Sequence, residues 1–255
     1  MIKHTKLKMK TTNYHSARPA YPGDVVIETH SGFVKPKIEV FINKTLNYVS
    51  AQLCVTAMIV YYMYSNRDIV IDRLSKDPGL VWTPIIFTFI SLIGMHFCEG
   101  VRKIMFCIFT ICCSLMVGIS VLQYSPGVVM NAVVTTCIIV IIANSYSYWC
   151  AKNGKDLAVL EPMLGMGLLV LIIAGLINMI LKLTIVHLLL TVLGVFVFTM
   201  FLVFDLNRLY MTDDNQAVLE DPMLAAVAIY LDIINLFLYL LELYDKVVNC
   251  KDDDK

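Results

Sequence analysis

The chain has 255 residues, of which 58% are hydrophobic and only 16% are charged, and its mean hydropathy is +0.74. In soluble domains nearer a quarter of the residues are charged, and a soluble fold of this size could not bury so much apolar surface. The formal net charge is zero and no basic patch is interleaved with aromatic residues, so we expect no nucleic-acid partner.

Residues 1–40 are polar and basic, with several prolines and glycines and no long apolar stretch. Such a composition cannot bury a hydrophobic core, so we expect a mobile N-terminal tail. A signal peptide needs a short apolar core, and none occurs before the first predicted span, so we expect no cleavable signal peptide.

Seven apolar stretches follow, each close to the roughly 20 residues that a membrane-spanning helix needs. The predicted helices cover residues 46–66, 79–98, 103–123, 128–149, 158–180, 183–205 and 222–244. The gaps between them are short, which makes consecutive helices antiparallel neighbours. We therefore predict an all-α membrane protein, with one seven-transmembrane helix bundle over residues 41–247 and a charged C-terminal tail at 248–255.

The lysines and arginines near the predicted helix ends indicate the orientation of the bundle. Most of the 20 lysines and arginines would share the side of the N-terminus, which the positive-inside rule places in the cytosol. The C-terminal lysines would lie on the other side if the last segment crosses, so the rule leaves open a re-entrant segment that dips in and returns. We favour a crossing, because residues 222–244 are long enough to span the membrane with some tilt.

Asp232 lies near the middle of the last predicted helix, among aliphatic and aromatic residues. A carboxylate at membrane depth is costly and therefore indicates a functional site. Asn235, Tyr239 and Glu242 follow at steps of three or four residues, which puts them on the same helix face as Asp232. We expect this polar face of the last helix to point to the interior of the bundle.

Asp205 ends the apolar run of the preceding predicted helix. Taken alone, it could be a helix-end aspartate that pairs with Arg208 one turn further on. Together with Asp232, it predicts two carboxyls that antiparallel neighbouring helices bring close and that share a proton, which would make a pH-sensitive gate. Deprotonated, the pair supplies oxygen ligands for Ca²⁺, but too few for a tight site, so we expect weak transit of the ion and no resident cofactor.

Other polar residues give weaker indications. Glu220 and Asp221 precede the last helix, where acids stabilise a helix N-terminus or could form an acidic mouth that concentrates cations. Thr45, Gln52 and Thr56 share one face of the first helix, and such residues more often hold helices together than conduct ions. His187 has no ligand spacing and is interpreted as an isolated histidine.

Enzyme signatures are missing from the sequence. There is no Ser-His-Asp pattern, no Gly-rich phosphate loop and no His-Glu-x-x-His sequence. An intramembrane aspartyl protease would also need two aspartates, but its Tyr-Asp, Gly-x-Gly-Asp and Pro-Ala-Leu motifs do not occur here. We therefore expect a protein that is not an enzyme.

The segment 228–243 resembles the last helix of the Bax inhibitor family, most of all its lifeguard and Golgi anti-apoptotic branch. Asp232 then falls on one member of that family's aspartate pair and Asp205 on the other, although Leu206 replaces the usual Thr. The resemblance spans roughly residues 40–245. Weaker matches lie at residues 41–44, 52–56, 109–110, 152–156 and 220–221, and departures lie at Asn43, at Cys112 and Cys113, and in the loop 99–102.

The resemblance implies a seven-helix bundle with the last helix in the centre. It also implies a pH-sensitive Ca²⁺ leak across Golgi or endoplasmic reticulum membranes, and suppression of apoptosis by lowering the releasable Ca²⁺ store. In bacterial members a basic side chain holds the aspartate pair, and Arg102 is the candidate for that role here.

Two functions from different classes therefore remain open. The first is a Ca²⁺ leak channel gated by Asp205 and Asp232. The second is a non-conducting membrane adaptor that inhibits cell death by binding apoptosis regulators, with the aspartates only structural. The expected partners are the lipid bilayer and Ca²⁺ in the first case, and the bilayer and apoptosis regulators in the second.

Overall fold

A computed structural model describes residues 37–77, 79–97, 99–212 and 221–253, and within these ranges all regular structure is helical. The long helices are α1 (Lys37–Ser65), α3 (Gly79–Phe97), α4 (Arg102–Val121), α5 (Pro126–Lys152), α6 (Glu161–Leu181), α7 (Thr184–Met211) and α9 (Pro222–Asp253). The short ones are α2 (Arg67–Lys76), η1 (Glu99–Val101) and η2 (Ala158–Leu160). Seven of the described helices are long and apolar enough to cross a membrane, which confirms the predicted class of fold.

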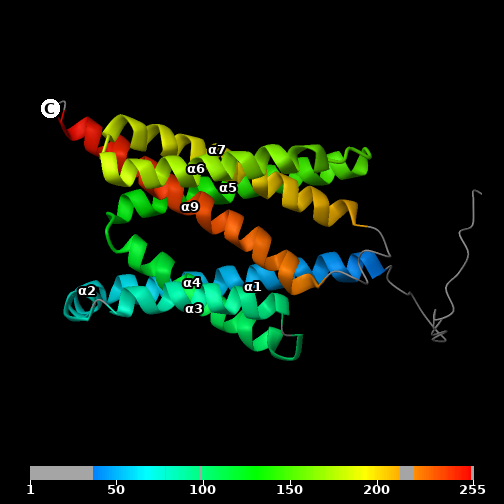
Figure 1. The fold of residues 1–255 in the computed structure, drawn as a ribbon, viewed down its shortest axis with the longest axis horizontal. Helices are drawn as coiled ribbons and strands as arrows, with labels where there is room; N and C mark the ends of the chain where they lie inside the picture. Colours follow the sequence, from blue (N-terminus) through cyan, green and yellow to red (C-terminus); the bar gives the residue numbers. More distant parts are fainter. Residues whose placement is uncertain (1–36, 78, 98, 213–220, 254–255) are drawn as a thin grey trace, which may run out of the picture. The chain divides into compact units, whose positions relative to one another are not determined.

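The membrane-spanning helices form two layers of three, with the seventh between them (Figure 1). In one layer α1 and α3 pack against α4, and in the other α5 and α6 pack against α7. α9 crosses diagonally and is the one described helix that packs extensively against both layers, through α1, α5 and α7. In its most apolar part 61% of α9 is buried, against 17–39% for the other six spans, which confirms that the last helix is central.

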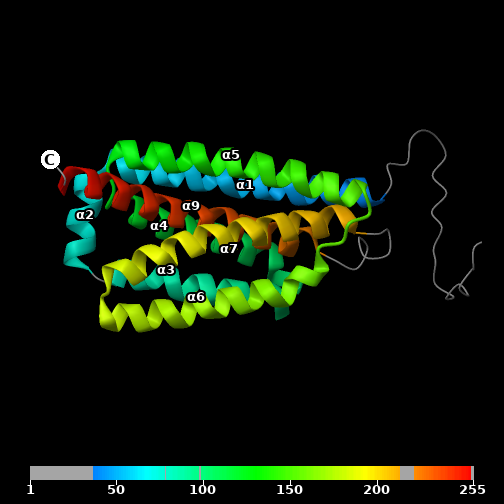
Figure 2. The same cartoon turned by 90° about the horizontal axis from the view of Figure 1, so that it is seen from above.

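The long helices run along one common axis, and α2 lies across that axis at one end (Figure 2). The starts of α1 and α9 share one end of the bundle with the α3–α4 and α5–α6 connections. The opposite end holds α2, the α4–α5 and α6–α7 connections and the end of α9. This alternation is the one expected for antiparallel neighbours joined by short connections.

Several boundaries differ from those predicted. α1 begins at Lys37, so its first turn falls within the segment 1–40 that the sequence assigns to a mobile tail; residues 1–36 lie outside the described part of the chain. α9 continues to Asp253, through most of the predicted charged tail. Because α9 is one continuous helix, the re-entrant alternative for the last segment is wrong.

Candidate functional site

α7 and α9 bring Asp205 and Asp232 together between the two layers of the bundle, towards the end that holds the start of α9. Their carboxyl groups lie within hydrogen-bonding reach of each other. Asp232 is only 7% exposed, and its Oδ2 atom has no hydrogen-bond partner among the described residues. Two carboxyls this close are more stable when one of them carries a proton than when both are charged.

The charged groups close to Asp205 come from two helices. Arg208 lies one turn further along α7, and Glu161 lies at the start of α6. The positive charge of Arg208 stabilises the ionised form of Asp205, and the negative charge of Glu161 destabilises it. For Asp232 the charged neighbour is Asp205 itself. The two members of the pair thus have different electrostatic surroundings.

A cavity of about 490 Å³ opens beside Asp205, at the end of the bundle that holds the start of α9. Its charged and titratable lining consists of His96, Arg102, Asp205, Arg208 and Asp221. Asp232 is not part of this lining. Asp205 is therefore accessible from the cavity, whereas Asp232 is buried and does not line it.

Arg102 makes its described ion pair at the rim of this cavity. Its Nη1 donates to Asp221 Oδ2 at 2.6 Å, and its Nε donates to the carbonyl oxygen of Met95 at 3.0 Å. The described salt bridge of Arg102 is thus with Asp221, and not with Asp205 or Asp232, for which the sequence offered it as a basic partner.

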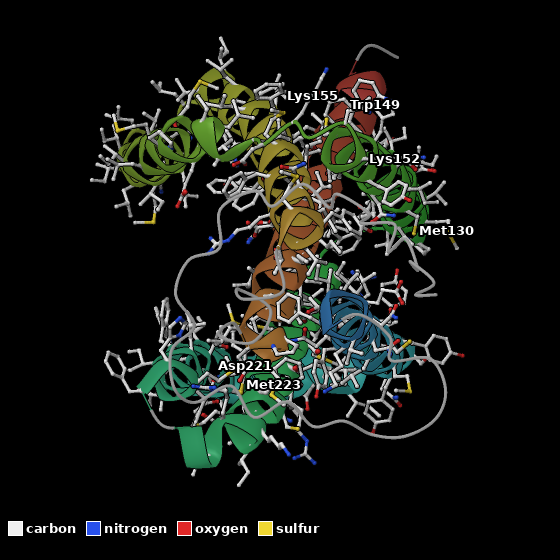
Figure 3. The ribbon with its side chains drawn as sticks, turned by 90° about the vertical axis from the view of Figure 1, so that its right-hand side faces the viewer. Met130, Trp149, Lys152, Lys155, Asp221 and Met223 are labelled. Carbon is white, nitrogen blue, oxygen red and sulfur yellow. The ribbon has the colours of Figure 1, made fainter. Side chains whose placement is uncertain are left out.

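Asp221 also caps the last helix. Its Oδ1 accepts a hydrogen bond from the backbone N–H of Met223 at 2.8 Å, in the first turn of α9. Figure 3 looks at this end of the bundle and shows both residues where α9 begins. Asp221 therefore stabilises the helix N-terminus and lines the cavity at once. Glu220, the other member of the predicted acidic mouth, lies outside the described residues.

The polar face of α9 continues from Asp232 towards the other end of the bundle, against α7. Asn235 Nδ2 donates to the carbonyl oxygen of Leu231 on its own helix at 2.9 Å. Tyr239 stacks on Phe198 of α7 with ring centroids 5.6 Å apart. The Tyr239 ring also covers Gly194, where a Cβ would lie 2.5 Å from it. This aromatic contact fills the α7–α9 interface beyond the aspartate pair.

Glu242 ends the predicted polar face and has partners that the sequence did not reveal. Its Oε1 accepts a hydrogen bond from Thr191 Oγ1 at 2.9 Å and pairs with His187 Nε2 at 2.9 Å and Lys246 Nζ at 2.8 Å. The interpretation of His187 as an isolated histidine is therefore wrong. Its partner lies on a different helix, so no local spacing could indicate it.

A buried hydrogen-bond network joins α1 and α4 to α9. Thr56 Oγ1 bonds to Tyr230 OH at 2.8 Å and to Ser114 Oγ at 2.9 Å. One turn away, Gln52 Nε2 donates to Thr110 Oγ1 at 3.1 Å. The polar face of the first helix thus joins three helices, as the sequence predicts. Tyr230 was missed, because a tyrosine in an apolar helix gives no sign of what its hydroxyl binds.

Comparison with known proteins gives the family. The chain matches a family model described as inhibitor of apoptosis-promoting Bax1 over residues 38–247. It is 32% identical over 209 residues to a BI1-like protein of Arabidopsis thaliana. The aligned region covers 80% of this chain and 79% of that protein. Protein LIFEGUARD 4 of the same plant is 29% identical over 210 residues, with 80% and 83% covered. The Golgi anti-apoptotic protein of Vaccinia virus (strain Lister) is 32% identical over 139 residues, with 54% and 56% covered. The chain belongs to the Bax inhibitor family.

Proposed function

We propose that this protein is a pH-sensitive Ca²⁺ leak channel of Golgi or endoplasmic reticulum membranes that modulates apoptosis by lowering the releasable Ca²⁺ store. The observation that carries the proposal is the contact between Asp205 and Asp232, beside a cavity that reaches the first of them. Membership of the Bax inhibitor family and the name of the vaccinia relative support the role in apoptosis.

The aspartate pair has the chemistry of a gate. While the two carboxyls share a proton, a hydrogen bond holds α7 to α9. Loss of that proton puts two negative charges in contact in a largely buried site, which favours separation of the helices or entry of a cation. Two carboxylates offer fewer oxygens than the six to eight of a tight Ca²⁺ site, so a bound ion can leave again.

Conduction also requires a second change further along the interface. Tyr239 and Phe198 fill the space between α7 and α9 beyond the pair, so an ion that passes Asp232 meets an aromatic contact. In this proposal the described arrangement is the closed form, and opening moves α9 relative to α7.

The proposal is tested by Ca²⁺ flux in vesicles that contain the purified full-length chain, at acidic and mildly alkaline pH. We expect a leak in the wild type that changes with pH, and we expect Asp232→Asn and Asp205→Asn to remove the pH dependence. Asp72→Asn is the matched control, because Asp72 is an exposed aspartate of α2 that pairs with Lys76. A wild type without flux, or flux indifferent to both pH and Asp232→Asn, would overturn the channel and favour the adaptor.

We also propose that the end of the bundle with the start of α9 faces the cytosol, together with the N-terminus. The excess of lysine and arginine expected on that side supports this orientation. Glycosylation sites inserted after Lys76 and after Gly154 test it, because the two connections lie at opposite ends of the bundle. Modification at the first site alone is expected, and modification at the second alone would reverse the topology.

A further inference from the structure

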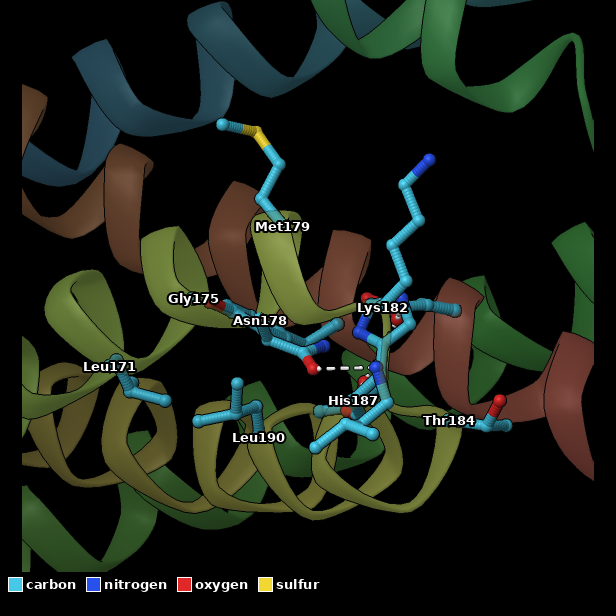
Figure 4. Close-up of a pocket in the computed structure, with 12 residues that line it drawn as sticks. Leu171, Gly175, Asn178, Met179, Lys182, Thr184, His187 and Leu190 are labelled. Carbon is cyan, nitrogen blue, oxygen red and sulfur yellow. Dashed lines mark hydrogen bonds and ion pairs between the residues drawn. The ribbon is translucent and has the colours of Figure 1, made fainter.

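A second cavity, of about 480 Å³, lies at the opposite end of the bundle between α6, α7 and α9 (Figure 4). Glu242, Thr191 and His187 are part of its lining, and so is Tyr239. Because Tyr239 belongs to the aromatic contact with α7, this cavity reaches that contact from the side away from the aspartate pair. The polar face of α9 therefore runs between two cavities, one at each end.

The described contacts of the Glu242 carboxylate all fall on one of its two oxygens. His187, Lys246 and Thr191 all contact its Oε1 atom, at 2.8 to 2.9 Å. None of these three contacts is to its Oε2 atom. The side chain is 24% exposed, so the carboxylate is partly withdrawn from solvent but can be reached from the cavity.

The ammonium group of Lys246 has a second partner that would remain if it left Glu242. Lys246 Nζ donates to Thr191 Oγ1 at 3.0 Å as well as to the carboxylate. His187 is 52% exposed and can turn towards solvent. The two basic groups can therefore release Glu242 without leaving a buried charge unpaired.

We propose that Glu242 is a second cation-binding group, at the far end of the conduction path, and that the ammonium of Lys246 is a tethered competitor for it. This inference rests on the proposed Ca²⁺ leak. A divalent cation in the cavity binds the carboxylate, Lys246 moves to Thr191 and to solvent, and the ion is then held beside the Tyr239 contact. The return of Lys246 to Glu242 expels the ion.

The other side-chain oxygens of the cavity lining are neutral and belong to Thr184, Thr191, Tyr239 and Asn178. Of these, Asn178 is already engaged, since its Oδ1 accepts a hydrogen bond from the backbone N–H of Leu183 at 3.1 Å. A hard divalent cation would therefore meet a single carboxylate and few further ligands, which gives weak binding and fast release. Both properties suit a site that ions pass through.

The experiment measures Mn²⁺ binding by electron paramagnetic resonance on the purified full-length chain, with Mn²⁺ as the probe for a hard divalent cation. All variants carry Asp232→Asn, which weakens the aspartate pair as a competing site. Lys246→Met is expected to tighten binding about tenfold, because the cation no longer has to break a charge-assisted hydrogen bond. Glu242→Gln is expected to abolish binding, and Glu242→Asp, which keeps the carboxylate, to retain it.

Lys182→Met is the matched control. Lys182 lines the same cavity, but it makes no described contact with Glu242, and in Figure 4 its side chain extends away from Leu190 on α7. Its removal therefore takes away one positive charge without freeing the carboxylate, and Mn²⁺ affinity should stay close to that of the parent. Equal tightening by the two lysine substitutions, or binding that survives Glu242→Gln, would overturn the proposal.

Failure of the channel and failure of this site give different results. A wild type that conducts no Ca²⁺ but whose Lys246→Met variant binds Mn²⁺ through Glu242 would overturn the leak and leave the binding site. A wild type that conducts Ca²⁺, with no Mn²⁺ binding that depends on Glu242, would overturn the site and leave the leak.

Discussion

Asp205 of α7 and Asp232 of α9 touch each other, yet only Asp205 lines the cavity at their end of the bundle. In the proposed channel, the proton shared by the pair exchanges with solvent through Asp205, from that end. In vesicles with uniformly oriented protein, the leak should respond to the pH on the α9-start side and not to the pH on the other side. An equal response to pH on both sides would contradict this route.

Protons and Ca²⁺ compete for the same carboxylate oxygens, so the Ca²⁺ affinity of the pair should fall as the pH falls. Asp232→Asn should lower the affinity by about tenfold, because one of two charged ligands is lost, and should flatten its pH dependence. The measurement is the Ca²⁺-dependent rise in melting temperature over a series of pH values. A variant whose pH profile matched the wild type would count against the shared proton.

Asp221 has two roles that different substitutions separate. Asp221→Ala removes both the ion pair with Arg102 and the cap on Met223, so it should reduce the free energy of unfolding by about 1–2 kcal/mol. Asp221→Asn keeps a capping oxygen and should cost less. Chemical denaturation in detergent compares the two, and equal losses would mean that the cap contributes nothing.

Gly194 lies under the ring of Tyr239, so any side chain there should disturb the α7–α9 contact. Gly194→Ala would put its Cβ 2.5 Å from the ring and should cost about 1–3 kcal/mol of stability. Gly175→Ala is the control, because no atom lies within 4 Å of the added Cβ. Addition of Tyr239→Ala should restore part of the loss, and the absence of any rescue would show that the ring is not the cause.

The hydrogen bond between Thr56 and Tyr230 is suited to a double-mutant cycle. Thr56→Val and Tyr230→Phe each remove one hydroxyl while keeping the shape of the side chain. We expect a coupling of about 0.6 kcal/mol, the average for such bonds between membrane helices. A coupling indistinguishable from zero in unfolding measurements would mean that the bond does not join α1 to α9 energetically.

The sequence predicts the spanning helices well where they are apolar and poorly where polar residues extend them. The predicted sixth span ends at Asp205, yet α7 continues to Met211. Asn207, in that extension, is buried because its Oδ1 accepts from the N–H of Leu157 and its Nδ2 donates to the carbonyl oxygen of Lys155. Partners of this kind come from other helices, so hydropathy alone cannot show that a polar turn lies inside the bundle.

The short helix α2 was missed for the opposite reason. Half of its ten residues are charged and only four are apolar, and none of its side chains is buried. No packing against the bundle is encoded in such a segment, so its sequence resembles an ordinary polar connection. In the same way, the contacts of Glu242 with His187 are a property of two helices that meet, and only their assembly reveals them.

The position of α9 has a consequence for the order of assembly. The helices that flank it come earlier in the chain, so both layers are synthesised before the helix that joins them. Until α9 inserts, Thr56 is bonded only within its own layer, to Ser114 and to the carbonyl oxygen of Gln52, and Asp205 lacks Asp232. Six helices would therefore stand in the bilayer as two layers that α9 has not yet joined, so the tertiary structure is completed only when the last helix inserts.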